Sequence, residues 1–127
     1  MVGCMANFYA KMAREAAKLS ECKRRQVGAV IVTETGHVIT GYNHMPEGIP
    51  YGLVCPNCPR EGKPNGEWSL TDECPAIHAE QDAIFKAARL GVRLASAVIY
   101  VSEKPCNICE RYIREAGMTL GGGWDEM

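Results

Sequence analysis

The spacing of hydrophobic residues changes several times along the chain, and each change predicts an element of secondary structure. From about residue 5 to residue 19, apolar side chains recur every three or four positions among charged ones, which predicts an amphipathic helix. The apolar residues are Met5, Phe8, Met12, Ala16 and Leu19. Residues 26–33 and 37–42 are rich in β-branched residues and flank a Glu-Thr-Gly turn, which predicts a hairpin of two strands.

Two residues of this hairpin have more than one interpretation. Gly28 weakens the first strand, and a glycine there is explained by the close approach of a ligand or of another backbone. His37 is more typical of a solvent-facing strand residue than of a ligand.

Residues 43–74 lose the periodicity and are rich in proline and glycine, so we expect a loop insertion. A loop of this length is uncommon in a compact domain unless it is functional or held in place. Cys55, Cys58 and Cys74 are the residues available to hold it.

A second helix is predicted over residues 77–90, which include apolar residues at 77, 84, 85, 88 and 90. It is expected to end there because Gly91 suits the left-handed conformation of the residue that follows a helix. Residues 97–102 form an apolar run typical of a buried strand, and residues 106–116 predict a third helix that ends at Gly117. The alternation of strands and helices predicts an α/β fold with a parallel strand pair. Only ten residues follow Gly117, and their triple glycine is typical of a flexible tail, so we expect a sheet that is short at its C-terminal end.

The 127 residues are enough for one hydrophobic core, which predicts a single domain over residues 1–127. The formal net charge of −1 does not indicate the basic surface that binding an extended nucleic acid requires. The first residues do not have the pattern of a signal peptide, and no apolar run approaches the ~18 residues that span a bilayer. We therefore expect a cytoplasmic protein without a membrane partner, whose cysteines are metal-binding thiolates rather than disulfides.

The candidate chemistry lies at His78 and at the pair Cys106 and Cys109. Either half alone has an ordinary explanation, because an isolated histidine is usually a surface or core residue and a C-x-x-C pair can be redox-active or structural. Together they are three zinc ligands that leave the fourth tetrahedral position open, as in a catalytic site. Glu80, two residues beyond His78, can reach a group at that open position and move protons.

The order H-x-E followed by P-C-x-x-C is the signature of zinc deaminases that act on nucleobases. Residues 5–117 resemble deoxycytidylate (dCMP) deaminases of the cytidine deaminase superfamily. The likeness rests on C-K-R-R-Q-V-G-A-V at 22–30, G-Y-N at 41–43, H-A-E-Q-D-A-I at 78–84 and P-C-N-I-C at 105–109. It implies a three-layer cytidine deaminase-like fold, a mixed sheet with helices on both faces, and the hydrolysis of dCMP to dUMP and ammonia, which supplies dUMP for thymidylate synthesis.

The resemblance also implies roles for individual residues. It assigns a catalytic zinc to His78, Cys106 and Cys109, and it makes Glu80 the general acid and base for attack at C4 of the cytosine ring. The substrate-binding residues implied are Arg24 for the phosphate, Asn43 for the sugar, and Ala79 and Ser102. A turn role for Asn43 and a capping role for Ser102 are the alternatives, while Lys23 and Arg25 are expected to be solvated.

A second, structural zinc is predicted at Cys22, Cys55, Cys58 and Cys74. The C-x-x-C at 55–58 has the spacing of tetrahedral thiolate sites, and Cys74 closes the same loop. Cys22 occupies the position at which related deoxycytidylate deaminases carry a cysteine that helps to bind a second zinc. Free buried thiols are the alternative.

The chain differs from the family in two places. His44 replaces the last glycine of the usual G-Y-N-G, so the resemblance does not imply allosteric control by dCTP and dTTP. The family continues into a fourth strand and beyond, which we do not expect here. Members commonly form hexamers, for which Phe85 and Arg89 are either interface residues or an ordinary core residue and a solvated charge.

Three other functions remain as alternatives. The protein can be a deaminase of free cytidine or deoxycytidine, or a deaminase of a tRNA base, which should have a more basic surface. It can also be a non-catalytic zinc-stabilised interaction module, but such a module has no need of Glu80.

Overall fold

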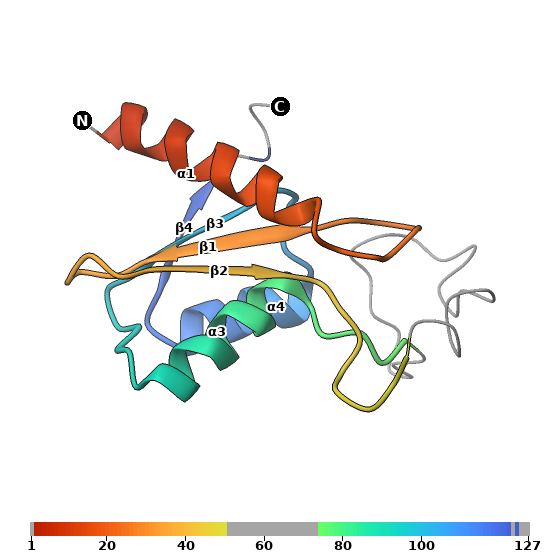
Figure 1. The fold of residues 1–127 in the computed structure, drawn as a ribbon. Coiled ribbons are helices and arrows are strands. Elements are labelled where there is room, and N and C mark those ends of the chain that lie inside the picture. The colour runs from red at the N-terminus through yellow and green to blue at the C-terminus, as the bar shows by residue number, and fades with distance from the viewer. Residues whose placement is uncertain (1, 51–73, 123, 125–127) are drawn as a thin grey trace.

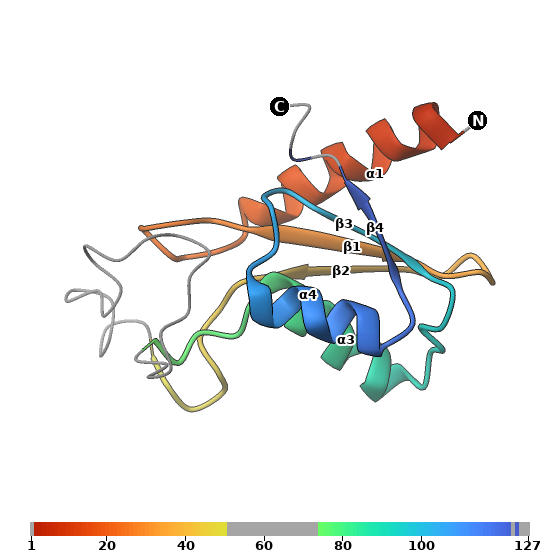
Figure 2. The ribbon, with the colours of Figure 1, turned by 180° about the vertical axis from the view of Figure 1, so that it is seen from behind.

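The computed structural model describes residues 2–50, 74–122 and 124. Its elements in chain order are α1 (Val2–Ala17), β1 (Gly28–Val32), β2 (Val38–Tyr42), α3 (Ala79–Leu90), β3 (Val98–Val101), α4 (Asn107–Glu115) and β4 (Thr119–Gly122). Figure 1 shows α1 on one face of the sheet and α3 with α4 on the other, and Figure 2 shows the same layers from behind. The predicted three-layer α/β fold with helices on both faces is confirmed.

The four strands form one mixed sheet in the order β2-β1-β3-β4. β1 pairs antiparallel with β2 and with β3, whereas β3 and β4 are parallel and are joined through α4. The predicted hairpin is therefore present. The parallel pair is not the one that the sequence implied, because it joins β3 to β4, a strand that we did not expect, whereas β3 is antiparallel to its neighbour in the hairpin. The core between the sheet and α3 and α4 includes Ile31, Ile99 and Ile113, which are almost fully buried. In the described part of the chain, we find no helix with both the length and the apolar character to cross a membrane.

Glycines on neighbouring strands let both helical layers approach the sheet closely. A Cβ atom on Gly28 would lie 2.0 Å from the Ala13 carbonyl oxygen of α1, so the backbone interpretation of this glycine is correct. A Cβ atom on Gly41 would lie 2.4 Å from the Ala79 carbonyl oxygen, at the start of α3. Gly41 therefore allows the helix that follows His78 to lie directly on β2.

The same close packing explains why the predicted apolar face of α1 is largely wrong. Met5, Phe8 and Leu19 are exposed. The buried positions of this segment are small instead: Ala10, Ala13, Ala16 and Ala17. A helix whose backbone touches the sheet has room only for methyl groups between them, so side-chain size outweighs hydrophobicity here.

The expectation that no fourth strand follows Gly117 is wrong, because β4 pairs with β3. Gly121 and Gly122 belong to that strand and not to a flexible tail. The ring of Tyr100 explains the glycine at 121, since a Cβ atom there would lie 2.5 Å from Cε2 of the ring. The glycine makes space for an aromatic ring on the neighbouring strand.

Candidate active site

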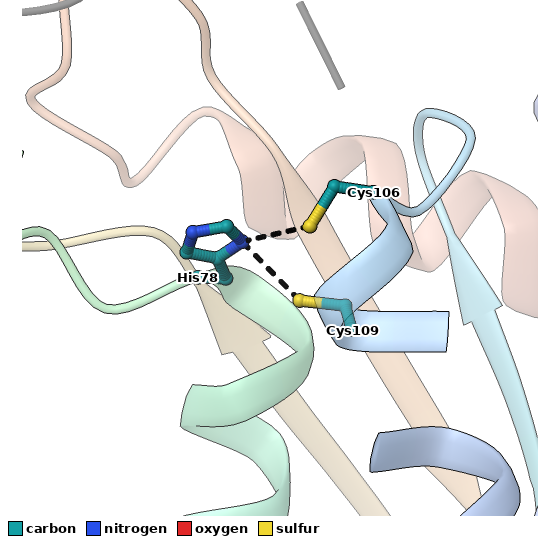
Figure 3. A group of neighbouring side chains, drawn as sticks. All are labelled: His78, Cys106 and Cys109. Atoms are coloured by element: carbon teal, nitrogen blue, oxygen red, sulfur yellow. Dashed lines mark hydrogen bonds between the residues drawn. The ribbon is translucent and has the colours of Figure 1, made fainter. Parts of the chain in front are cut away.

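The three predicted zinc ligands lie at the N-termini of two neighbouring helices. His78 is the residue that precedes α3, Cys106 precedes α4, and Cys109 is in the first turn of α4. His78 Nδ1 is 3.2 Å from the Sγ of Cys109 and 3.6 Å from the Sγ of Cys106 (Figure 3). Residues 31 positions apart in the chain thus meet at one point.

This arrangement fits a tetrahedral metal. The ligand atoms of His78, Cys106 and Cys109 all lie within 4.8 Å of one another. Among the described residues, these three form the cluster of side chains that could hold a metal ion. A tetrahedral zinc with bonds of ~2.0–2.3 Å has edges of about 3.5 Å between its ligand atoms. One nitrogen and two sulfurs at these separations match three corners, and the fourth remains for water or substrate.

The electrostatic environment at the N-terminus of α4 favours the thiolate form of a cysteine there. Hydrogen bonding from the Cys109 thiol, followed by that from His78, lowers the pKa of Cys106 to about 3. The same bond to Cys106, together with burial, raises the pKa of Cys109. The N-terminus of α4 adds a favourable field for a negative sulfur at Cys106. The pair thus holds one thiolate readily, and a divalent cation would stabilise the second.

Glu80 completes the site without belonging to the ligand group. Its side chain is in the first turn of α3 and the residue is 4 % exposed. Burial raises the pKa of its carboxyl, against the opposing effect of a hydrogen bond with its own backbone and of the nearby His78. The carboxyl also lies near enough to Cys109 to raise the pKa of that thiol. A buried acid beside an open ligand position can hold or release a proton during a reaction.

The backbone at His78 is fixed from within α3. The His78 N–H donates to Oε1 of Gln81 at 3.0 Å, and the Asp82 N–H donates to the His78 carbonyl at 2.8 Å. Ala79, predicted to bind substrate, is fully buried beneath this turn. Gln81 and Asp82 were not among the predicted site residues, although polar residues in the first turn of a helix are a recognised capping signal.

The predicted phosphate-binding arginine lies in the segment between α1 and β1. Arg24 is half-buried, and residues 20–26 line a surface cavity. Arg25 is not the solvated neighbour that we expected, because its Nε donates to Oε1 of Glu103 at 2.6 Å and its side chain is only 19 % exposed. Lys23 is exposed as expected.

Asn43 and Ser102 both make hydrogen bonds within the protein. Asn43 Oδ1 accepts from the Val27 N–H at 2.9 Å, and its Nδ2 donates to the Arg25 carbonyl at 2.8 Å. Ser102 Oγ accepts from the Gly28 N–H at 2.9 Å. These are long-range bonds to the start of β1 and the residues before it, so they are neither a turn nor a helix cap, and they bring both residues close to the segment that carries Arg24. Contact with a nucleotide remains a prediction for each.

The four cysteines of the predicted second zinc site are only partly described by the structure. Cys22 and Cys74 are half-buried. Cys55 and Cys58 lie outside the described residues. The second site therefore remains a prediction from the sequence.

Comparison with known proteins finds a family and several relatives. Residues 5–120 match the family model of the cytidine and deoxycytidylate deaminase zinc-binding region. A deoxycytidylate deaminase of Mycobacterium phage D29 is 34% identical over 116 residues, which cover 87% of each chain. The deoxycytidylate deaminase of Schizosaccharomyces pombe is 34% identical over 115 residues, which cover 88% of this chain and 34% of the yeast protein. The chain thus spans about a third of the length of its yeast relatives.

Solved structures show the same architecture. The dCMP deaminase of cyanophage S-TIM5, crystallised with dCMP and dUMP, is 26% identical and superimposes with a TM-score of 0.67. The match covers 90% of this chain and 76% of the cyanophage protein. Cytidine deaminases superimpose less well, for example that of Burkholderia pseudomallei with a TM-score of 0.53 and 23% identity, and that likeness concerns the fold alone.

Proposed function

Because the chain belongs to the family of cytidine and deoxycytidylate deaminases, we propose that it hydrolyses dCMP to dUMP and ammonia and so supplies dUMP for thymidylate synthesis. The observation that carries the proposal is the buried carboxyl of Glu80 beside the cluster of His78, Cys106 and Cys109. A non-catalytic zinc module needs no acid at an open ligand position, so this geometry supports an enzyme.

In the proposed reaction, three residues bind the metal and one residue transfers protons. Zinc held by His78, Cys106 and Cys109 would supply an activated water as the nucleophile for C4 of the cytosine ring. Glu80 accepts one proton of the nucleophile and delivers it to ring N3. It then accepts the second proton from the hydroxyl group now on C4 and delivers it to the departing amino group, so that ammonia leaves and the C4 carbonyl forms. Its raised pKa suits this work, because the carboxyl must hold the proton between the steps. Its burial keeps that proton from exchanging with bulk water.

The choice of dCMP over an unphosphorylated nucleoside is supported by the relatives and by the 20–26 segment. The phage relative, which matches over most of its own length, is a deoxycytidylate deaminase. Arg24 lies among residues 20–26, which line a surface cavity, and it is the candidate for the phosphate. A guanidinium fork suits a phosphate dianion. The net charge of −1 gives no support to the tRNA alternative.

An ammonia-release assay with dCMP, CMP, deoxycytidine and cytidine tests the proposal directly. We expect dCMP to have the highest kcat/KM of the four. A preference for deoxycytidine or cytidine over both nucleotides would contradict it and would favour the nucleoside alternative.

Replacing Arg24 separates phosphate recognition from the chemistry. Arg24→Ala should lower kcat/KM for dCMP by about 10–100-fold, because a charge-assisted hydrogen bond contributes about 1.5–3 kcal/mol. The weaker reaction with deoxycytidine should change little, since that substrate has no phosphate. Lys23→Ala, at the exposed neighbouring position, is the control and should affect neither substrate. Equal losses on both substrates in Arg24→Ala would indicate a folding role instead.

A second, structural zinc at Cys22, Cys55, Cys58 and Cys74 is part of the proposal. The C-x-x-C spacing at 55–58 and the position of Cys74 shortly before α3 support it. Such a metal would tie the insertion to the core and so help to position the start of α3.

Assembly and regulation are proposed from the family. A homo-oligomer, with a hexamer as the expected form, is consistent with the exposure of Phe85 and Arg89 on α3. Effects of dCTP and dTTP remain open, because His44 stands where the family has glycine. A cytoplasmic location, where nucleotide pools are maintained, remains the expected one.

A further inference from the structure

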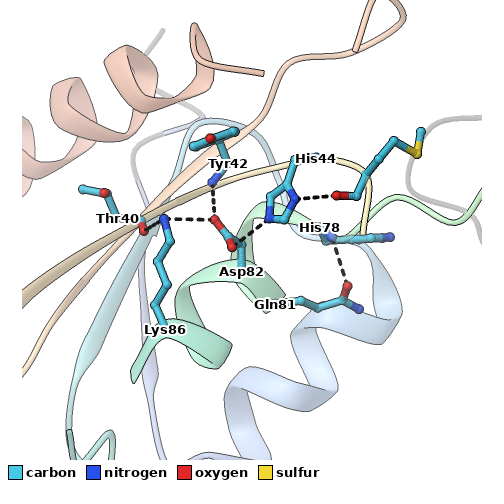
Figure 4. A network of polar contacts seen from close by, with 8 residues as sticks. Thr40, Tyr42, His44, His78, Gln81, Asp82 and Lys86 are labelled. Atoms are coloured by element: carbon cyan, nitrogen blue, oxygen red, sulfur yellow. Dashed lines mark hydrogen bonds and ion pairs between the residues drawn. The ribbon is translucent and has the colours of Figure 1, made fainter. Parts of the chain in front are cut away.

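Asp82 is a buried carboxylate on α3 that the proposed chemistry does not use. The residue is 4 % exposed. Its Oδ1 lies 2.8 Å from Nε2 of His44, and its Oδ2 accepts from the Tyr42 N–H at 3.2 Å and from Nζ of Lys86 at 3.2 Å (Figure 4). A charge in this position is costly unless it is fully paired, and these partners come from the end of β2, from the residues after it and from α3 itself.

His44 contacts α3 and the residue in front of it in two independent ways. Its ring reaches Asp82, and its backbone forms an isolated bridge with Ile77, with N–H to carbonyl distances of 3.1 and 2.7 Å. Ile77 immediately precedes His78, and the Asp82 N–H donates to the His78 carbonyl at 2.8 Å. These bonds form a closed ring around the backbone of the metal ligand. His44 therefore holds the chain on both sides of His78.

The orientation of the His44 ring is itself fixed. Nδ1 lies 2.8 Å from the Met45 carbonyl oxygen, and Nε2 faces the Asp82 carboxylate. Both ring nitrogens therefore lie within hydrogen-bond distance of an oxygen atom, one at each end of the ring. The ring also lies against that of Tyr42, with centroids 5.6 Å apart. A side chain with both nitrogens and one face engaged has little freedom to move.

Glu80 lies within the segment that this ring of bonds encloses. Residues two apart on a helix point about 200° apart, so Asp82 faces β2 while Glu80 faces the metal ligands. Asp82 thus acts on the reaction only through the backbone that carries Glu80. Catalytic geometry must be held to within about 0.5 Å, and an error of 1 Å can cost about 100-fold in rate.

We propose that His44 and Asp82 are a positioning pair that holds the first turn of α3, and with it the carboxyl of Glu80, in the geometry that deamination needs. The proposal rests on the proposed function for its catalytic part. It gives a role to a histidine that lies outside the metal ligands. His44 bonds to the helix, which a glycine in that position has no side chain to do.

The test is His44→Ala, with His44→Gln as the conservative variant and His37→Ala as the matched control. His37 also makes side-chain hydrogen bonds, to Thr33 and Thr35, but at the opposite end of β2. His44→Ala should lower kcat for dCMP about 10–100-fold while KM stays within about twofold. His44→Gln, whose amide can donate to Asp82, should recover kcat to within about threefold of wild type. His37→Ala should leave both parameters unchanged.

Amide hydrogen exchange gives a readout that does not depend on turnover. In His44→Ala, amides of residues 78–83 should exchange at least about tenfold faster, whereas those of β1 and β3 should not change. A kcat in His44→Ala equal to that of His37→Ala, or unchanged exchange at 78–83, would overturn the proposal. If the wild type releases no ammonia from dCMP, the proposed function fails, and the exchange difference alone then supports or overturns the holding role.

Discussion

Glu80→Gln is expected to keep its zinc and to lose turnover of dCMP by about a thousandfold. The amide has the same shape and can form hydrogen bonds, but it cannot take a proton from the nucleophile or return it to the base. The residue is 4 % exposed, so bulk water has little access to replace its carboxyl as proton carrier. Ammonia release under single-turnover conditions, with zinc measured on the same sample, checks both halves of the expectation.

A carboxylate elsewhere on the protein is the control for this change. Glu15 on α1 forms an ion pair with Lys18 at 2.6 Å, and both side chains are largely exposed. Glu15→Gln should therefore leave activity and zinc content at wild-type levels. Turnover of Glu80→Gln within about tenfold of wild type would contradict the assignment of the proton carrier. Loss of zinc would instead mean that the substitution disturbs the ligands.

Most of the fold could be predicted because its elements have strong local signals. The helix ending at Gly91 is one example, since this residue has the expected left-handed φ of 70°. The errors arose where the determining contact was distant. The glycines of β4 read as a tail because nothing nearby in sequence indicates that the ring of Tyr100 packs on Gly121. The apolar face of α1 was misplaced because Gly28 decides how closely that helix approaches the sheet.

The site shows the same division between local and distant information. The ligands His78, Cys106 and Cys109 could be identified from residue type and spacing alone. The environment of Glu80 could not, because its burial depends on how two helices meet. The contact between His44 and Asp82 joins residues 38 positions apart, and only the placement of α3 against β2 reveals it.

Zinc stoichiometry is expected to separate the catalytic and structural sites. Metal-replete, fully reduced protein should contain two zinc per chain. Cys109→Ala should contain one and release no ammonia, because two ligands remain at the site that His78 shares with Cys106. The double variant Cys55→Ser/Cys58→Ser should also contain one, since it retains the catalytic ligands. Structural zinc in small domains binds with about 10–16 kcal/mol, comparable with the whole stability of a domain, so this variant should also have a much lower Tm.

Cys4→Ser is the control for the zinc measurements, because Cys4 belongs to neither predicted ligand set, and it should retain two zinc and full activity. Combining Cys109→Ala with Cys55→Ser/Cys58→Ser should remove all zinc, which would show that the two losses come from independent sites. One zinc per chain in reduced wild type would remove the structural site from the proposal and leave the catalytic one. Two zinc in Cys109→Ala would mean that the cluster at the start of α3 and α4 does not hold the catalytic metal, and the deaminase mechanism argued from it would fail.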